Sequence, residues 1–439
     1  MDMKEKIVLP FLLLLFFPEV SGAGQYQSLE SFAGMTVTRI QLQGNRFTRD
    51  FVILRELRTR IGAPLDPQRV RKDLQRLDNL DIFSSIRIEP HTEEGGIALT
   101  IRVREIPFAV PYISYDVSDQ DGWSFGPAVK SVNMLGLDMF VAGYALFGGR
   151  NSFLLDLSYP WIAGNHISLD LDVSRIERDN ELDRFRETSF ELSPWIGTYV
   201  GDNGRAGIGL SYFRFESDLA GHTLSADNTD HLLQTGVRLG YDSRDSWGDP
   251  HRGRLDQIEL RKTGGLLPGD GDYWTAHLDL RRFQPITSTH TLVLAGLLSL
   301  QSGRIGRDIP EYMDFHLGGS NSIRGYALNE LGSSLFGQNQ WLGSLEYRFP
   351  LLPSREYLLL GLASDLGLSG ALFVDHGLAW SEGDDLALGR SRTGFGLGLR
   401  LLLPAVEMTR LDVGFDRDGN WHIHFASFSK MGAQRLRLR

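Results

Sequence analysis

The chain has 439 residues, with 45 lysines and arginines against 55 aspartates and glutamates, and a formal net charge of −10. This acidic balance argues against nucleic acid as a partner, because neutralising phosphates requires clustered Lys and Arg. The absence of cysteine excludes disulfides and Cys-ligated metals, and the 49 glycines are typical of a chain with many strands and tight turns.

Residues 1–23 carry the pattern of a secretory signal peptide. Two lysines precede the apolar stretch IVLPFLLLLFF, and the small residues SGA that follow suit a cleavage site. A membrane anchor is the alternative, but the stretch is short and interrupted by proline. We therefore expect a mature chain that begins near Gly24. No later segment holds about 18 consecutive apolar residues, which excludes a helical membrane protein but leaves a strand-built one open.

Residues 36–105 predict a small α+β domain with the order β-α-α-β-β. The segment TVTRIQLQG alternates like a strand, and Thr48 is placed to cap a helix that ends at Gly62. Asp66 and Pro67 open a second helix, after which the turn HTEEGG joins the strands SSIRIEP and IALTIRVRE. With LQGN, LDNLDIFSSIRIE and IRVRE, this order resembles a POTRA domain, a periplasmic module that docks polypeptide. Any small α+β domain of the same order is the less specific alternative.

Residues 107–430 alternate polar and apolar side chains with a period of two, and a basic tail follows at 431–439. In WTAHLDLRR, for example, Thr275 and Asp279 are expected on the face opposite Trp274 and Leu280. NHISLDLDVSR repeats the scheme, with His166 placed on the polar face. Turn signals divide the region into about 16 strands, an even number typical of single-chain bacterial barrels. A soluble sandwich would alternate in the same way, but the signal peptide and the strand count favour a 16-stranded transmembrane antiparallel β-barrel.

Three stretches of this region resemble the barrel of the superfamily that contains BamA, TamA and the two-partner-secretion transporters. They are YDSRDSWGDPHRG at 241–253, HLGGSNSIRGY at 316–326 followed by GSLEYRFP at 343–350, and FVDHG at 373–377. The resemblance implies a barrel in the outer membrane and a domain at 36–105 in the periplasm. It also implies a set of barrel-motif residues, which are Asp242, Arg244, Asp245, Pro250, Gly253, Phe373 and Gly377.

The resemblance further implies that the loop after the eleventh barrel strand folds back into the lumen, where Arg324 meets Asp375 and, as a second candidate, Glu346. A guanidinium in a narrow lumen cannot lose its proton and needs a fixed carboxylate. A lone Arg would otherwise be an exposed loop residue, but the motif and both downstream acids favour the lumen. We interpret this lumen loop latch as architectural and not catalytic. Its residues are Gly318, Gly319, Ile323, Arg324, Gly325, Tyr326, Glu346 and Asp375.

The first and last strands, VPYISYDV and NWHIHFASFSK, are expected to meet in a seam that includes Pro111, Trp421, Phe425 and Phe428. Pro111 cannot donate to a ladder and favours a weakly paired edge, although it is also compatible with a simple strand start. In WHIHF, two lumen-facing polar histidines are a simpler account than a metal site. Aromatic residues such as Trp195 are expected in interfacial girdles.

We therefore expect an outer-membrane factor that docks unfolded polypeptide at residues 36–105 and inserts or exports it through the barrel or its lateral seam. Its partners would be outer-membrane lipid and unfolded outer-membrane or secreted clients, while binding of periplasmic chaperones or lipoproteins is left open. A passive or gated solute channel is the alternative. No cofactor, metal or nucleotide is implied, and the absence of G-x-S-x-G, phosphate-loop and H-E-x-x-H motifs argues against an enzyme.

Overall fold

The computed structural model describes residues 29–427, except for positions 79, 81, 107–108, 119–121, 163–165, 181–184, 202, 246–248, 328–334, 360–361, 385–389 and 404–405. The expected signal peptide at 1–23, the tail at 431–439 and Phe428 lie outside the described residues.

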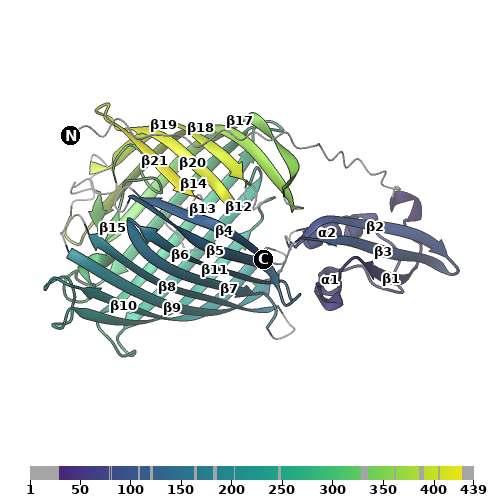
Figure 1. Cartoon of the computed structure of the whole chain (residues 1–439), viewed down its shortest axis with the longest axis horizontal. Helices are drawn as coiled ribbons and strands as arrows, with labels where there is room; N and C mark the ends of the chain where they lie inside the picture. Colours follow the sequence, from purple (N-terminus) through teal and green to yellow (C-terminus); the bar gives the residue numbers. More distant parts are fainter. Residues whose placement is uncertain are drawn as a thin grey trace.

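The N-terminal domain is a three-stranded sheet with two α-helices (Figure 1). Its sheet order is β1-β3-β2, with β1 parallel and β2 antiparallel to β3. The predicted β-α-α-β-β order is confirmed. The elements are η1 (Leu29–Phe32), β1 (Val37–Gln43), α1 (Asp50–Glu56), α2 (Pro67–Asp78), β2 (Phe83–Glu93) and β3 (Gly96–Glu105).

The helix α1 is shorter than the sequence predicts, because it ends at Glu56 and not at Gly62. The buried carboxylate of Asp73, on α2, accepts hydrogen bonds from the backbone N–H groups of Arg58 and Thr59, both at 2.9 Å. These bonds stabilise a non-helical backbone directly after α1. A tertiary contact therefore ends the helix before the glycine does.

Most of the remaining described chain forms one 16-stranded sheet in which every pair of neighbouring strands is antiparallel, as predicted (Figure 1). Its first eight strands are β4 (Val110–Ser118), β5 (Gly122–Met134), β6 (Met139–Gly148), β7 (Arg150–Tyr159), β8 (Ile167–Asn180), β9 (Phe185–Val200), β10 (Gly204–Ser217) and β11 (Thr229–Asp242). The last eight are β12 (Gly253–Gly264), β13 (Asp272–Pro285), β14 (Thr291–Ser302), β17 (Asn339–Leu359), β18 (Leu362–Trp380), β19 (Arg392–Leu403), β20 (Val406–Phe415) and β21 (Trp421–Ser427). Between β14 and β17 lie η2 (Glu311–Met313), β15 (Phe315–His316) and β16 (Phe336–Gly337).

The two faces of the barrel wall have opposite character. On β13, Trp274 and Leu280 are exposed on the outside, whereas Thr275 and Asp279 are buried on the inside, as the alternation predicts. Apolar side chains thus face the surroundings and ionic ones face the lumen, which is the arrangement that a barrel in lipid requires. None of the described helices is long and apolar enough to cross a membrane.

Two predictions about the barrel region are wrong, one for Trp195 and one for His166. Trp195 is not in a girdle: it is buried in the lumen, where the Arg238 guanidinium lies 3.8 Å from its ring centroid. His166 is not on the polar face of a strand, because its backbone is left-handed (φ 56°) and β8 begins one residue later. Burial together with the nearby Arg55 and Arg58 lowers the pKa of His166, which favours a neutral ring in this turn.

The N-terminal domain contacts the barrel through the turn between β5 and β6. The hydroxyl of Thr48 accepts a hydrogen bond from Asn133 Nδ2 at 2.8 Å and does not cap α1, so that predicted role is wrong. Arg55 of α1 forms a 2.8 Å ion pair with Asp138, and both side chains are largely buried. Val132 packs against the core of the N-terminal domain. The domain is therefore fixed to the barrel by polar and apolar contacts together.

We predict that Arg55→Ala loosens the domain, because it leaves the buried Asp138 without its cation. The chain has no native cysteine, so spin labels at Ile61→Cys and Ile286→Cys, both exposed, report the domain–barrel distance by electron–electron resonance. The expected result is a distance distribution about twice as broad. Arg39→Ala is the matched control, since its 2.7 Å pair with Glu93 is solvent-exposed. An unchanged distribution in Arg55→Ala contradicts the prediction.

Candidate functional site

The segment between β14 and β17, which joins the eleventh and twelfth barrel strands, folds into the lumen. Its turn is closed by Ser322, whose hydroxyl contacts both the N–H and the carbonyl of Gly318, and by a 2.8 Å hydrogen bond from the Gly319 N–H to the Tyr326 carbonyl. The backbone φ values of Gly318, Gly319 and Gly325 are 128°, 75° and 133°. Residues other than glycine rarely adopt this conformation. The sharp reversal therefore depends on these glycines.

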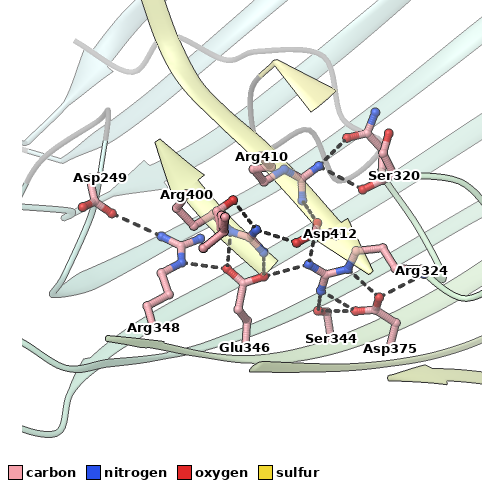
Figure 2. A network of polar contacts seen from close by, with 12 residues as sticks. Asp249, Ser320, Arg324, Ser344, Glu346, Arg348, Asp375, Arg400, Arg410 and Asp412 are labelled. Atoms are coloured by element: carbon pink, nitrogen blue, oxygen red, sulfur yellow. Dashed lines mark hydrogen bonds and ion pairs between the residues drawn. The ribbon is translucent and has the colours of Figure 1, made fainter. Parts of the chain in front are cut away.

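Arg324 lies at the tip of this loop and is buried against the inner barrel wall (Figure 2). Its Nε and Nη2 donate to the two carboxylate oxygens of Asp375 on β18 at 2.7 and 2.9 Å, a bidentate pair. The backbone N–H of Arg324 also donates to Asp375, at 3.1 Å. Its Nη1 donates to Glu346 on β17 at 2.8 Å and to Asp412 on β20 at 3.3 Å. One guanidinium thus links the loop to three strands of the wall.

The network continues beyond the loop tip through Arg400, on β19 (Figure 2). Arg400 donates to Glu346 at 2.6 Å and to Asp412 at 2.5 Å, so it connects the two carboxylates that also bind Arg324. Arg348 donates to Glu346 at 2.8 Å. Three cations thus face three carboxylates in a space from which water is largely excluded. The mutual pairing offsets the cost of burying each charge.

Two strand glycines let the loop backbone lie directly on the wall. A β-carbon at Gly394 would be 2.0 Å from the Arg324 carbonyl oxygen, and one at Gly414 would be 2.6 Å from the Gly325 nitrogen. On the far side of the tip, the Gly325 N–H donates to His424 Nε2 on the last strand, at 3.4 Å. The loop tip therefore lies at backbone distance from β19 and β20, and a side chain of β21 reaches it.

Apolar packing supports the same loop. Ile323 and Tyr326 are buried, and they pack in one cluster with Leu317 and with wall residues that include Leu297 and Leu342. The tip is therefore stabilised on one side by ion pairs and on the other by apolar contacts.

Sequence analysis predicted part of this site. It predicted that Arg324 contacts Asp375 and Glu346, but it did not predict that Asp412 and Arg400 belong to the same network. Both are ionisable residues at inward-facing positions between apolar outward-facing neighbours, and that parity was a usable signal. Arg410 was also missed; it donates to the Ser320 carbonyl at 2.9 Å and so fixes the loop one turn before the tip.

The match to a family model decides what kind of barrel this is. Residues 133–427, more than half of the chain, match the model described as the Omp85 superfamily domain. The chain belongs to the Omp85 superfamily. Residues 35–106 match the POTRA model described as a surface antigen variable number repeat. The protein is accordingly an outer-membrane Omp85 barrel with its POTRA domain in the periplasm.

Curated and structural relatives agree with this assignment. The chain is 25% identical over 417 residues to "Outer membrane protein assembly factor BamA" of Nitratidesulfovibrio vulgaris, covering 90% of this chain and 50% of that protein. It is 24% identical over 385 residues to the protein of the same name from Neisseria meningitidis serogroup B, covering 78% and 46%. The chain thus spans about half the length of the curated relatives it matches.

Two solved structures share the fold of this Omp85 chain. A crystal structure of BamA from Haemophilus ducreyi lacking POTRA domains 1–3 has a TM-score of 0.62 at 16% identity, over 90% of this chain and 85% of that one. CdiB from Escherichia coli has a TM-score of 0.59 at 14% identity, over 91% and 78%.

Five residues of the Omp85 barrel motif lie in or beside the turn between β11 and β12. Arg244 forms a bidentate pair with Asp242 at 2.7 and 2.9 Å. Asp245 accepts hydrogen bonds from backbone N–H groups across the turn, and Pro250 is buried. A β-carbon at Gly253 (φ 104°) would be 2.1 Å from a backbone oxygen of the same turn. These contacts join the two described ends of the turn.

The other two motif residues contact the loop tip. The Phe373 ring lies 3.6 Å from the Arg324 guanidinium carbon, a cation–π contact that adds to the ion pairs. A β-carbon at Gly377 would be 2.6 Å from the Trp341 carbonyl oxygen and 3.3 Å from the Ile323 side chain. Phe373 and Gly377 lie on the same inward face of β18 as Asp375. Their side chains carry no group that could pair with its carboxylate.

The Omp85 barrel is not joined at its seam by a backbone ladder among the described residues, because the sheet order ends at β4 on one side and β21 on the other. Side chains bridge the seam: the hydroxyls of Tyr115 on β4 and Thr409 on β20 are 2.9 Å apart, and the ring centroids of Trp123 on β5 and Phe425 on β21 are 5.5 Å apart. Pro111 lies within β4, opposite Val129 of β5.

The two histidines of the last strand, His422 and His424, lie two residues apart on the same inward face of β21, as the alternation predicts. His424 is buried beside the loop tip, and its ring centroid is 6.1 Å from that of His422. Among the described residues, no group of three or more potential ligands could hold a metal ion. Trp421 is exposed on the outside of the same strand.

We predict that Arg324→Ala lowers the free energy of unfolding by about 3–5 kcal/mol, because it leaves the buried Asp375 without its cation and removes one of the cations that pair with Glu346 and Asp412. Arg324→Lys should recover only part of this loss, since an ammonium cannot form the bidentate pair. The measurement is urea unfolding in lipid vesicles, followed by tryptophan fluorescence. Arg254→Ala removes an exposed 3.1 Å pair with Asp256 and should cost at most about 1 kcal/mol. Equal losses in Arg324→Ala and Arg254→Ala contradict the latch.

Proposed function

We propose that this protein is an outer-membrane assembly or translocation factor, which docks unfolded polypeptide at its POTRA domain and inserts or exports it through the barrel or its lateral seam. The observation that carries the proposal is the seam between β4 and β21, where side chains meet without a backbone ladder in the described chain. Strand edges of this kind can pair with an incoming strand by β-augmentation.

The physics of the bilayer supplies a driving force without a nucleotide. In lipid, every backbone N–H and C=O group must find a partner within protein, so an incoming strand gains most by pairing with an existing edge. Closure of the client then buries its apolar outer face in lipid. We propose that the protein works in this way with no catalytic step and no cofactor.

The names of the relatives support the coarse part of this proposal. The two curated relatives are named as outer membrane protein assembly factors. Because this chain spans about half of their length, the identity of its clients is our proposal: unfolded outer-membrane or secreted polypeptides. Periplasmic chaperones and lipoproteins are candidate further partners.

The test is the folding rate of an unfolded β-barrel client in liposomes that contain the purified protein. Tyr115→Cys with Thr409→Cys, bridged by a short reducible bismaleimide, closes the seam in a chain without native cysteine. We expect wild type to accelerate folding at least several-fold, the bridged variant to lose this acceleration, and reduction to restore it. Single-cysteine variants treated with the same reagent are the control.

Two outcomes count against the proposal. Equal acceleration by bridged and reduced protein would show that the seam does not admit the client. No acceleration by wild type, together with a steady conductance that survives deletion of residues 36–105, would favour a solute channel.

A further inference from the structure

We propose that the POTRA domain binds the phospholipid surface of the periplasmic leaflet through one apolar face beside the barrel rim. This α1 face consists of Phe47, Phe51 and Leu54, which are 41%, 46% and 41% exposed. Phe51 and Leu54 lie three residues apart on α1, so they share one side of the helix. Val52 and Ile53, on the other side, are fully buried in the core of the domain. The helix thus has two apolar sides, and the domain itself covers only one.

The contacts with the barrel fix the α1 face at the rim. The Arg49 N–H donates to the Gly136 carbonyl at the tip of the β5–β6 turn, at 3.0 Å. A β-carbon at Gly136 would be 2.1 Å from the Phe47 carbonyl oxygen, so the two backbones touch. The Arg55 guanidinium lies 4.9 Å from the ring centroid of Trp161, in the turn that follows β7. The α1 face therefore has a fixed place beside two neighbouring turns of the barrel.

These turns continue the lipid-facing surface of the barrel. The outward side chains of β5, which include Phe125 and Val129, are exposed and apolar. At the end of the same strand, Leu135 is exposed in the turn, and Ile162 is exposed in the next periplasmic turn. Barrel rims lie at the level of the lipid headgroups. The α1 face, Leu135 and Ile162 thus extend the apolar belt to the periplasmic interface.

The charge of the segment complements a phospholipid surface. Residues 45–55 contain three arginines and one acidic residue, in a chain whose net charge is −10. Arg46 and Arg49 are exposed. An exposed apolar face flanked by cations is the pattern of segments that lie in the membrane interface, because apolar side chains enter the acyl boundary while Arg meets phosphate groups.

A polypeptide client is the other class of partner that an exposed apolar face can bind. The fixed position at the rim and the cluster of arginines favour lipid. This inference does not depend on the proposed assembly function, since lipid contact requires no client.

The test uses an environment-sensitive fluorophore on Leu54→Cys of the full-length protein, in bilayers of phosphatidylethanolamine and phosphatidylglycerol with or without brominated acyl chains. We expect a blue-shifted emission and quenching by brominated lipid of about half or more. The matched control is Ile61→Cys, which is 63% exposed. The neighbouring Gly62 N–H bonds to Val37 at the start of β1, which places this label about 20 Å from Phe47, at the far end of the strand. We expect no quenching there.

A second variant tests the face itself. Phe47→Ser with Phe51→Ser, in the Leu54→Cys background, should reduce the quenching at least two-fold, and heat-dependent gel mobility checks that the barrel is folded. Three results would overturn the proposal: no quenching at position 54, equal quenching at positions 54 and 61, or a response at position 54 that occurs only when an unfolded client is added. The last result would assign the face to polypeptide.

Discussion

The buried guanidinium of Arg324 is the constraint on which the barrel architecture depends. A cation that water does not reach must be neutralised by fixed anions, and here they come from β17, β18 and β20. If the loop left the lumen, or if these strands separated, charged side chains would lose their partners in a poorly hydrated interior. The loop and this part of the wall therefore behave as one rigid unit, which glycines at the contact points allow to pack at backbone distance.

On the other side of the seam, the barrel wall is attached to the POTRA domain. The POTRA domain leads directly from β3 into β4, and it is fixed by α1 to the turn between β5 and β6. The latch thus stiffens the wall up to β20 and β21, whereas the periplasmic domain is tied to the first three strands. The seam lies between these two parts of the structure, each of which is held by its own set of contacts.

The alternation, the strand number and the small domain were predicted because each has a local signal in the sequence, whereas the pairing of Arg324 with Asp375 and Glu346 was implied by the family resemblance. Asp412 and Arg400 were not predicted, since parity shows that a side chain faces inward but not which residues become neighbours; that depends on register across several turns. Thr48 was misassigned for a related reason: its hydroxyl bonds to Asn133, 85 residues away, and not to its own helix. Trp195 followed the same alternation as its neighbours, and its inward parity overrides the preference of aromatic residues for interfaces.

Hydrogen exchange of the folded protein in a lipid bilayer tests most directly whether the latch makes one side of the barrel rigid and leaves the seam weak. We expect fast amide exchange in the seam-facing parts of β4 and β21 and slow exchange in β17 to β19. When Arg324 is replaced by Ala, the exchange rate should increase selectively in β17 to β20. Uniform protection around the barrel, or an Arg324→Ala profile identical to that of wild type, would contradict this account.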